Sequence, residues 1–140
     1  MTRNSRGLAA SIEAAILLPV LVLFVGLLVI SARIALAQQA LTAVASQAAR
    51  VASLERNVGE GQREASAAVR TGLAEHDLEC VSSQIDVDVA GLAAPLGSAA
   101  EVRVAVRCSV SFADVSLPFM PGSHQLEAEA VSPVDRFRQR

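Results

Sequence analysis

A run of 19 uncharged residues, from position 14 to position 32, constrains this chain more than any other feature of its sequence. An α-helix rises about 1.5 Å per residue, so a helix of this length covers the hydrocarbon core of a bilayer, which is about 30 Å thick. A single carboxylate, Glu13, directly precedes the run. The chain is therefore predicted to be inserted in a membrane at some stage of its life.

The charges on either side of the run predict its orientation. The preceding stub carries Arg3, Arg6 and an α-amino group, whereas the first charge after the run is Arg33. Because basic residues favour the cytoplasmic side of a membrane span, we expect a cytoplasmic N-terminus and an exported C-terminal part.

Composition limits what the exported part can be. About 100 residues remain after the membrane run and its stem, which is enough for one small domain with a thin core. All 12 basic residues are arginines and they are scattered singly, so no nucleic-acid-binding surface is predicted. The chain has no Trp or Tyr and only four Phe, which leaves no aromatic platform for stacking bases or sugars.

A stripe of apolar residues predicts that the membrane helix continues as a stem. These residues recur at spacings of three, four or their sum, while polar residues fill the opposite face. One helix is therefore expected over residues 11–57, roughly 70 Å long at about 1.5 Å per residue. The stripe consists of Leu41, Val44, Ala48, Val51 and Val58.

Proline and glycine are expected to interrupt and end this helix. Pro19 lacks an amide hydrogen and clashes with the preceding turn, so a kink or local melting is expected there. Gly59 and Gly61 are expected to end the helix. A second helix is predicted over residues 62–75, with one apolar face formed by Ala65, Val69 and Leu73.

In the last third of the chain, apolar and polar residues alternate, which predicts three half-buried strands. Such strands turn an apolar face toward a core and a polar face toward solvent. We therefore expect an α+β fold, in which a long N-terminal transmembrane and stem helix packs against a small antiparallel three-stranded meander. The strands are predicted at residues 85–89, 102–112 and 125–130, with connections at 91–100 and 113–123.

These elements predict five segments along the chain. Residues 1–13 form a cytoplasmic stub, 14–32 a transmembrane helix, 33–58 a stem helix and 59–132 an exported α+β domain. The polar residues from about Ser132 to the end are expected to be loose, and residues 133–140 are assigned to a polar tail.

Cys80 and Cys108 are the only cysteines, and both fall in the exported part. An oxidising compartment favours a disulfide between them, which would stabilise the domain by roughly 3 to 4 kcal/mol in the chain-entropy model. Zinc bound by these two residues with His76 and His124 is the less favoured alternative.

The predicted register of the strands places a condition on this disulfide. If Val87 lies opposite Val104, the apolar faces match, and Cys108 points inward while Cys80 points outward. Either Cys80 precedes the regular strand, or a bulge near Ser82 and Ser83 turns it over.

Several of these features together resemble the TadE-like proteins. This family comprises pseudopilin-like components of the Tad (Flp) pilus machinery, related in plan to the type IV pilins. The resemblance is strongest over residues 6–53. It rests on Arg6-Gly7 followed by small residues, Glu13, the apolar run, Pro19 six residues after the glutamate, an Ala/Gln/Arg-rich stem, and an ending of Ala130-Val131-Ser132-Pro133-Val134-Asp135-Arg136-Phe137-Arg138.

The resemblance implies a pilin-like fold and a minor pilin-like subunit that works by assembly, without catalysis or a cofactor. Its implied partners are membrane lipid, other pilin-like subunits, Tad machinery proteins and a prepilin peptidase. In pilin-like precursors this peptidase cuts after a glycine, here between Gly7 and Leu8. Glu13 lies six residues after Gly7, one farther than usual, and Ala14 follows where an aromatic residue or Leu is common. An uncleaved N-terminus at Met1 is therefore the alternative.

The resemblance also implies a role for the carboxylate. In pilin-like assemblies it pairs with the freed N-terminal amine of a neighbouring subunit, which gives a charge in hydrocarbon the partner it needs. Glu13 and Pro19 would belong to this assembly segment. Alternatively, Glu13 lies at the headgroup level near the start of the helix, where the helix dipole favours a negative charge.

A cleaved signal peptide is the competing interpretation of the apolar run. Ala35-Leu36-Ala37 forms a small-residue cleavage site, and a cut before Gln38 would release a secreted or envelope-anchored binding protein. Against this, the run exceeds the usual apolar length of about 7–15 residues, and Arg33 intervenes before the site.

No motif predicts an enzyme or a metal centre. The sequence offers no nucleophile and base pair and no phosphate-binding loop, and Asp86 and Asp88 alternate on what is predicted to be a solvated strand face. The most apolar loop, at residues 115–122, is either a contact patch for a partner or a plug of the core.

Overall fold

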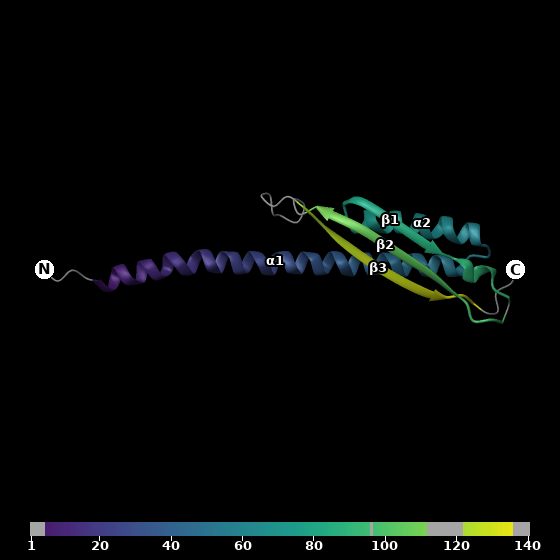
Figure 1. Cartoon of the computed structure of the whole chain (residues 1–140), viewed down its shortest axis with the longest axis horizontal. Helices are drawn as coiled ribbons and strands as arrows, with labels where there is room; N and C mark the ends of the chain where they lie inside the picture. The colour runs from purple at the N-terminus through teal and green to yellow at the C-terminus, as the bar shows by residue number, and fades with distance from the viewer. Residues whose placement is uncertain (1–4, 96, 112–121, 136–140) are drawn as a thin grey trace. The chain divides into compact units, whose positions relative to one another are not determined.

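The computed structural model describes residues 5–95, 97–111 and 122–135, with side chains from residue 13 onward. Its elements follow the order α1 (Ser5–Leu54), α2 (Val58–Glu75), β1 (Cys80–Asp88), a 3-10 helix (Ala90–Ala93), β2 (Glu101–Ser111) and β3 (Ser123–Pro133) (Figure 1). A long apolar N-terminal helix, a shorter helix and an antiparallel sheet confirm the predicted α+β class. The chain divides into two compact units, Met1–Ile34 and Ala35–Arg140.

The three strands form an antiparallel meander in the order β1-β2-β3. Val87 lies opposite Val104, which confirms the predicted register, and Val104 in turn lies opposite Ala130. Along β2 the side chains alternate strictly, with Val102, Val104 and Val106 fully buried between more exposed neighbours. One face of the sheet is therefore the core face and the other faces solvent.

The core face of the sheet packs on α2 and on the part of α1 that belongs to the second unit. Leu41, Val44 and Ala48 of the predicted stripe are buried there, whereas Val51 is half-buried. Small residues let the helices approach closely: a Cβ added at Gly72 of α2 would lie 2.8 Å from Cγ2 of Val44. The buried alanines of α1 are Ala45, Ala48, Ala49 and Ala52.

The junction between the two helices differs from the prediction. The helix α1 ends at Leu54 and α2 begins at Val58, so Gly59 and Gly61 lie in the first turn of α2 and end no helix. The side chain of Asn57 caps α2 by accepting a hydrogen bond from the amide of Glu60 at 2.8 Å. The second helix therefore begins before the predicted residue 62.

Gly61 has a packing role instead. It is buried, and a Cβ there would lie 2.6 Å from Cδ1 of Leu92 and 3.4 Å from the carbonyl oxygen of Ala52. The predicted buried stripe includes Val58, but this residue is the first of α2 and is 38% exposed. The predicted face of Ala65, Val69 and Leu73 is buried, as expected.

The helix α1 continues through Pro19 without interruption, so the prediction of local melting at this residue is wrong. A proline removes a single backbone donor, and the hydrogen bonds of the turns on either side hold the helix together.

The end of β3 also differs from the prediction of a loose tail. The strand extends to Pro133, and the next residue, Val134, is only 5% exposed. The amide of Val134 donates a hydrogen bond to the carbonyl of Ala100 at 2.9 Å. An apolar side chain and a backbone bond thus fix these residues, while residues 136–140 lie outside the described part of the chain.

Cys80 and Cys108 form the predicted disulfide, with their Cα atoms 5.3 Å apart. The register of β1 shifts between Cys80 and Ser82, which leaves Val81 as an extra residue. Because side chains alternate along a strand, this bulge changes the parity of Cys80 relative to the strand that follows. The bulge alternative is therefore the correct one. It also leaves no pair of free thiols for the zinc alternative, because both cysteines are bonded.

A charge buried at the contact between α1 and α2 should destabilise the domain. We predict that Val44→Asp, at a residue 2% exposed, lowers the free energy of unfolding by at least about 3 kcal/mol, because the carboxylate has no partner there. Ala43→Asp, at the exposed neighbouring position, is the matched control and should change stability by less than about 0.5 kcal/mol. Thermal and denaturant unfolding of both variants measure these losses of stability. Equal destabilisation by the two variants would contradict the packing of α1 described above.

The disulfide should be needed for stability. We predict that the cysteines resist alkylation until a reductant is added, and that Cys108→Ser lowers the free energy of unfolding by about 2 to 5 kcal/mol. Mass spectrometry after alkylation, with and without reductant, measures the first effect. Complete labelling of both cysteines without reductant would contradict the disulfide.

Candidate functional site

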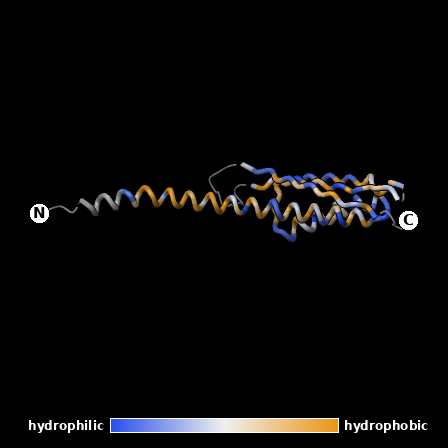
Figure 2. Tube along the Cα trace, turned by 90° about the horizontal axis from the view of Figure 1, so that it is seen from below, coloured by the Kyte–Doolittle hydropathy of each residue, from blue (hydrophilic) through white to orange (hydrophobic). Residues whose placement is uncertain are grey.

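The N-terminal half of α1 exposes an unusually continuous apolar surface. Its large aliphatic and aromatic side chains between Ile16 and Val29 are 48 to 74% exposed, and Figure 2 shows this segment as an apolar stretch of the tube. Soluble proteins rarely expose a contiguous apolar surface of this kind. These residues are Ile16, Leu17, Leu18, Val20, Leu21, Val22, Leu23, Phe24, Val25, Leu27, Leu28 and Val29.

By length and composition, this part of α1 is suited to cross a membrane. Its most apolar window has a mean hydropathy of 2.9 and contains no buried residue. A signal sequence near an N-terminus would satisfy the same criterion, so composition alone does not distinguish a retained anchor from a cleaved one.

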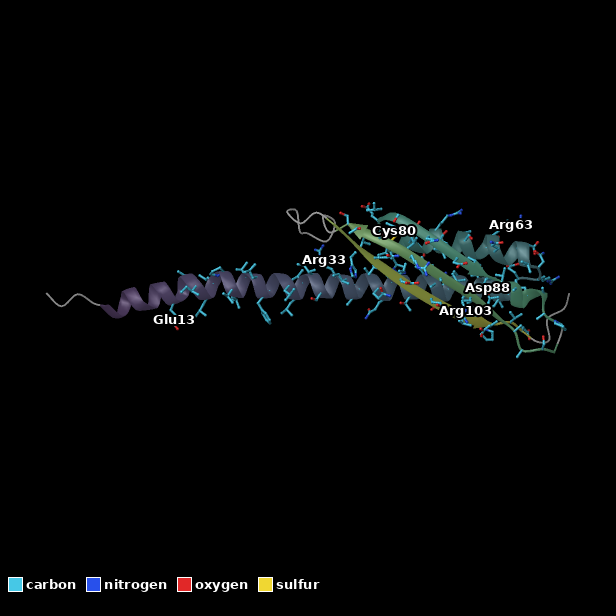
Figure 3. All side chains as sticks on the ribbon, viewed as in Figure 1. Glu13, Arg33, Arg63, Cys80, Asp88 and Arg103 are labelled. Atoms are coloured by element: carbon cyan, nitrogen blue, oxygen red, sulfur yellow. A yellow bond between two sulfur atoms is a disulfide. The ribbon has the colours of Figure 1, made fainter. Side chains whose placement is uncertain are left out.

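The structure places the other predicted site residues along the same helix. Gly7 and Leu8 lie within the helical backbone of α1, and Glu13 is exposed at the start of the apolar segment (Figure 3). Because successive helical residues are rotated by about 100°, Pro19 lies on a different face from Glu13. Among the residues whose side chains the structure describes, none forms an ion pair with the carboxylate of Glu13.

Gln38, the residue that would follow signal-peptide cleavage, belongs to the second unit. Its Nε2 donates a hydrogen bond to the backbone carbonyl of Glu127 in β3 at 2.6 Å. A chain starting at Gln38 would keep this bond and the buried residues from Leu41 onward. The fold of the second unit is thus compatible with either N-terminus.

The solvent-facing side of the sheet carries paired charges. Arg103 pairs with Glu129 and, at 3.3 Å, with Glu101, while Arg107 pairs with Glu127 at 2.8 Å. The hydrogen bond from Arg103 to Glu129 and the charge of that carboxylate raise the pKa of Arg103. Such exposed pairs contribute little to stability, but they order the side chains of this face. Asp86 and Asp88 lie on the same side of β1 and are exposed, which agrees with the predicted solvated face.

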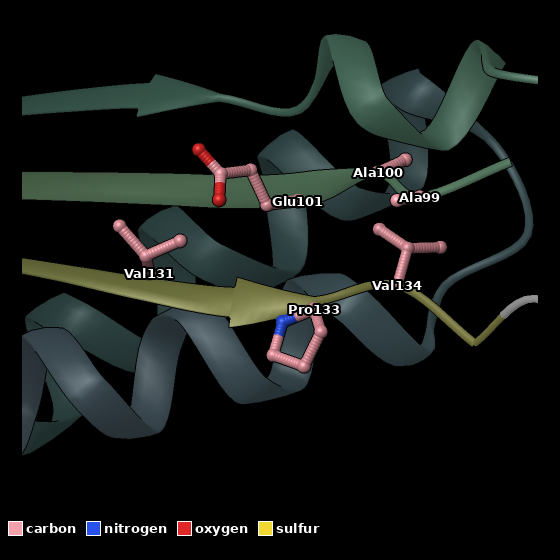
Figure 4. Close-up of a pocket in the computed structure, with 6 residues that line it drawn as sticks. All are labelled: Ala99, Ala100, Glu101, Val131, Pro133 and Val134. Atoms are coloured by element: carbon pink, nitrogen blue, oxygen red, sulfur yellow. The ribbon is translucent and has the colours of Figure 1, made fainter.

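Sequence reasoning did not identify a groove at one end of this face. The groove has a volume of about 510 Å³ and is formed where β2 begins and β3 ends (Figure 4). Its position depends on the pairing of the first residues of β2 with the last residues of β3, which lie about 30 residues apart, so no local pattern indicates it. It is lined by Ala99, Ala100, Glu101, Val131, Pro133 and Val134.

The predicted apolar loop gives no further site. Residues 115–121 lie outside the described part of the chain, and Gly122, which follows them, is exposed. The choice between a contact patch and a core plug therefore stays a prediction.

Comparison with known proteins identifies the N-terminal part. No curated protein and no solved structure gives a significant match to the chain. A family model described as TadE-like protein matches residues 9–50, which cover the exposed apolar segment and most of the helix that packs on the sheet. This match to residues 9–50 agrees with the resemblance to the TadE-like family predicted from the sequence.

Proposed function

We propose that this chain is a membrane-anchored minor pilin-like subunit of a Tad (Flp) pilus or a related secretion apparatus, and that it acts by helix-mediated assembly. The TadE-like match indicates a pilus-associated, pilin-like protein from a family of pilus components rather than enzymes. The observation that carries the proposal is the exposed apolar segment of α1, which coincides with that match.

The same apolar surface suits two environments. In the bilayer, lipid covers the exposed side chains of the segment 14–32, which supports a single-pass anchor. In an assembled fibre or its basal machine, helices of neighbouring pilin-like subunits would cover them instead. A Cβ added at Gly26 would have no other atom within 4 Å, so another helix can approach closely on that side.

Pairing of Glu13 with a neighbouring subunit would set the position of one helix along the other. A carboxylate at the head of an uncharged segment is costly in hydrocarbon unless it meets an opposite charge. Cleavage between Gly7 and Leu8 by a prepilin peptidase would supply such a charge, as the new N-terminal amine of a neighbouring subunit. The basic stub favours an orientation with this end in the cytoplasm and the sheet domain outside it.

The competing function is a secreted or envelope-anchored binding protein cut before Gln38. In that case Glu13 and the whole apolar segment would be missing from the mature protein. Variants of Glu13 would then have no effect on assembly, which makes this residue the sharpest test of the proposal.

We expect Glu13→Ala to leave membrane insertion intact, because removing a charge favours partitioning into lipid. The same change should reduce co-purification with pilin-like subunits by about tenfold, which corresponds to about 1.4 kcal/mol of lost pairing energy. Quantitative pull-down from detergent-solubilised membranes measures this loss. Glu64→Ala, at an exposed position of α2, is the matched control and should behave like the unchanged chain.

A second variant separates insertion from assembly. Leu23→Arg, in the middle of the apolar segment, should impair membrane insertion, since an arginine there costs about 2.5 to 3.5 kcal/mol. Normal assembly and normal piliation with Glu13→Ala, beside a clear defect with Leu23→Arg, would contradict the pairing role of Glu13 and leave only an anchor.

A further inference from the structure

The strand β3 forms one edge of the sheet, and its register shows which backbone groups point outward. The bond from the Val134 amide to the Ala100 carbonyl identifies this pair as a hydrogen-bonded pair of the β2-β3 ladder. Because hydrogen-bonded and non-bonded pairs alternate in an antiparallel ladder, the even-numbered residues of β3 bond to β2. The odd-numbered residues therefore direct their N–H and C=O groups away from β2.

Four consecutive odd-numbered residues of β3 direct backbone groups outward, where another strand could bond to them. They carry side chains on the solvent-facing side and form a regular strand without a bulge. Within the described part of the chain, one side chain reaches their outward backbone groups, because Gln38 donates a hydrogen bond to the Glu127 carbonyl. This bond occupies the Glu127 carbonyl, so an added strand would pair with the outward groups of Gln125, Glu129 and Val131. The four residues are Gln125, Glu127, Glu129 and Val131, and we call them the β3 edge.

The opposite edge of the sheet is less suited to pairing. The bulge between Cys80 and Ser82 interrupts β1, and the disulfide ties that end of the strand to β2. Bulges at edges twist the strand away and prevent the addition of another strand. The β3 edge lacks this protection until Pro133, which has no amide hydrogen.

The side chains beside the β3 edge define what could add to it. Val131 lines the groove of about 510 Å³ together with Pro133, on the solvent-facing side of the sheet (Figure 4). Two and four residues earlier on the same side lie Glu129 and Glu127, whose side chains are about half exposed. Five carboxylates and two arginines share this face, which leaves an excess of negative charge. The carboxylates belong to Asp86, Asp88, Glu101, Glu127 and Glu129.

We propose that the β3 edge binds an extended basic segment of a partner protein, which adds to the sheet as an antiparallel fourth strand. Backbone hydrogen bonds to Gln125, Glu129 and Val131 would hold the segment. Its alternate side chains would contact the solvent-facing side of the sheet and determine specificity. An apolar side chain enters the groove beside Val131, and arginine or lysine side chains two and four residues later meet Glu129 and Glu127. The segment thus has the pattern apolar-x-basic-x-basic.

Charge distinguishes this occupant from a second copy of the same strand. Antiparallel pairing of β3 with another β3 would bring Glu127 and Glu129 of both copies together, and like charges on neighbouring strands are destabilising. A basic strand removes this repulsion and adds cross-strand ion pairs. This inference concerns the sheet domain and does not depend on the proposed role of α1.

The experiment uses the full chain in detergent micelles with its disulfide intact. The probe is a fluorescein-labelled synthetic peptide, Ser-Val-Thr-Arg-Thr-Arg-Ser, and fluorescence anisotropy follows its binding. We expect saturable binding that weakens as the salt concentration rises, because the ion pairs are exposed. The same peptide with N-methyl groups on alternate backbone nitrogens, placed to face β3, should bind at least about tenfold more weakly.

Two variants test the site on the protein. Glu129→Pro removes an outward amide at a position where proline is tolerated in an edge strand, and it should weaken binding at least about tenfold. Glu129→Ala keeps the amide and should weaken binding only severalfold, which separates charge from backbone pairing if the proline variant fails to fold. Glu64→Ala on α2 should bind like the unchanged chain.

The proposal is overturned by equal binding of the N-methylated peptide, or by equal binding of a peptide with glutamate in place of arginine. Absence of saturable binding up to about 1 mM peptide would overturn it as well. Self-association of the chain without peptide, lost in Glu129→Pro, would instead assign the β3 edge to a second copy and contradict the basic partner.

Discussion

The packing of α1 on the sheet is the interaction on which the rest of the second unit depends. Ala45 and Ala49 of the helix are buried in the same core as Val102, Val104 and Val106 of β2, which are completely buried. Each buried valine contributes about 1.5 to 3 kcal/mol. A domain of this size has no second core to replace that contribution. The disulfide and the capped α2 add to this contact.

This contact has a consequence for function, because α1 continues without interruption from the buried stripe to the apolar segment. The helix is part of the domain core at one end and, by length and composition, a membrane span at the other. The sheet can then be presented by an anchor that needs no separate linker element. In the proposed function, the helix serves assembly and the solvent-facing side of the sheet stays available to a partner.

Much of this architecture could be predicted from the sequence, because it follows from local periodicity. The absence of charge predicts the apolar segment, alternation predicts the strands, and matching the apolar faces of β1 and β2 favours Val87 opposite Val104. The errors have tertiary causes. Gly61 was interpreted as a helix terminator because its contact with Leu92 cannot be seen in the sequence, and the burial of Val134 depends on its bond to Ala100. The groove and the β3 edge require the hydrogen-bonding parity of paired strands, which no local pattern contains.

The proposed function requires that the apolar part of α1 is retained in the mature protein, where it serves both as anchor and as assembly surface. N-terminal sequencing of the protein purified from membranes tests this most directly. We predict a mature chain that begins at Leu8 or Met1, with Glu13 and the whole apolar segment present. A mature chain that begins at Gln38 would contradict it, since the sheet domain would then be released without its anchor.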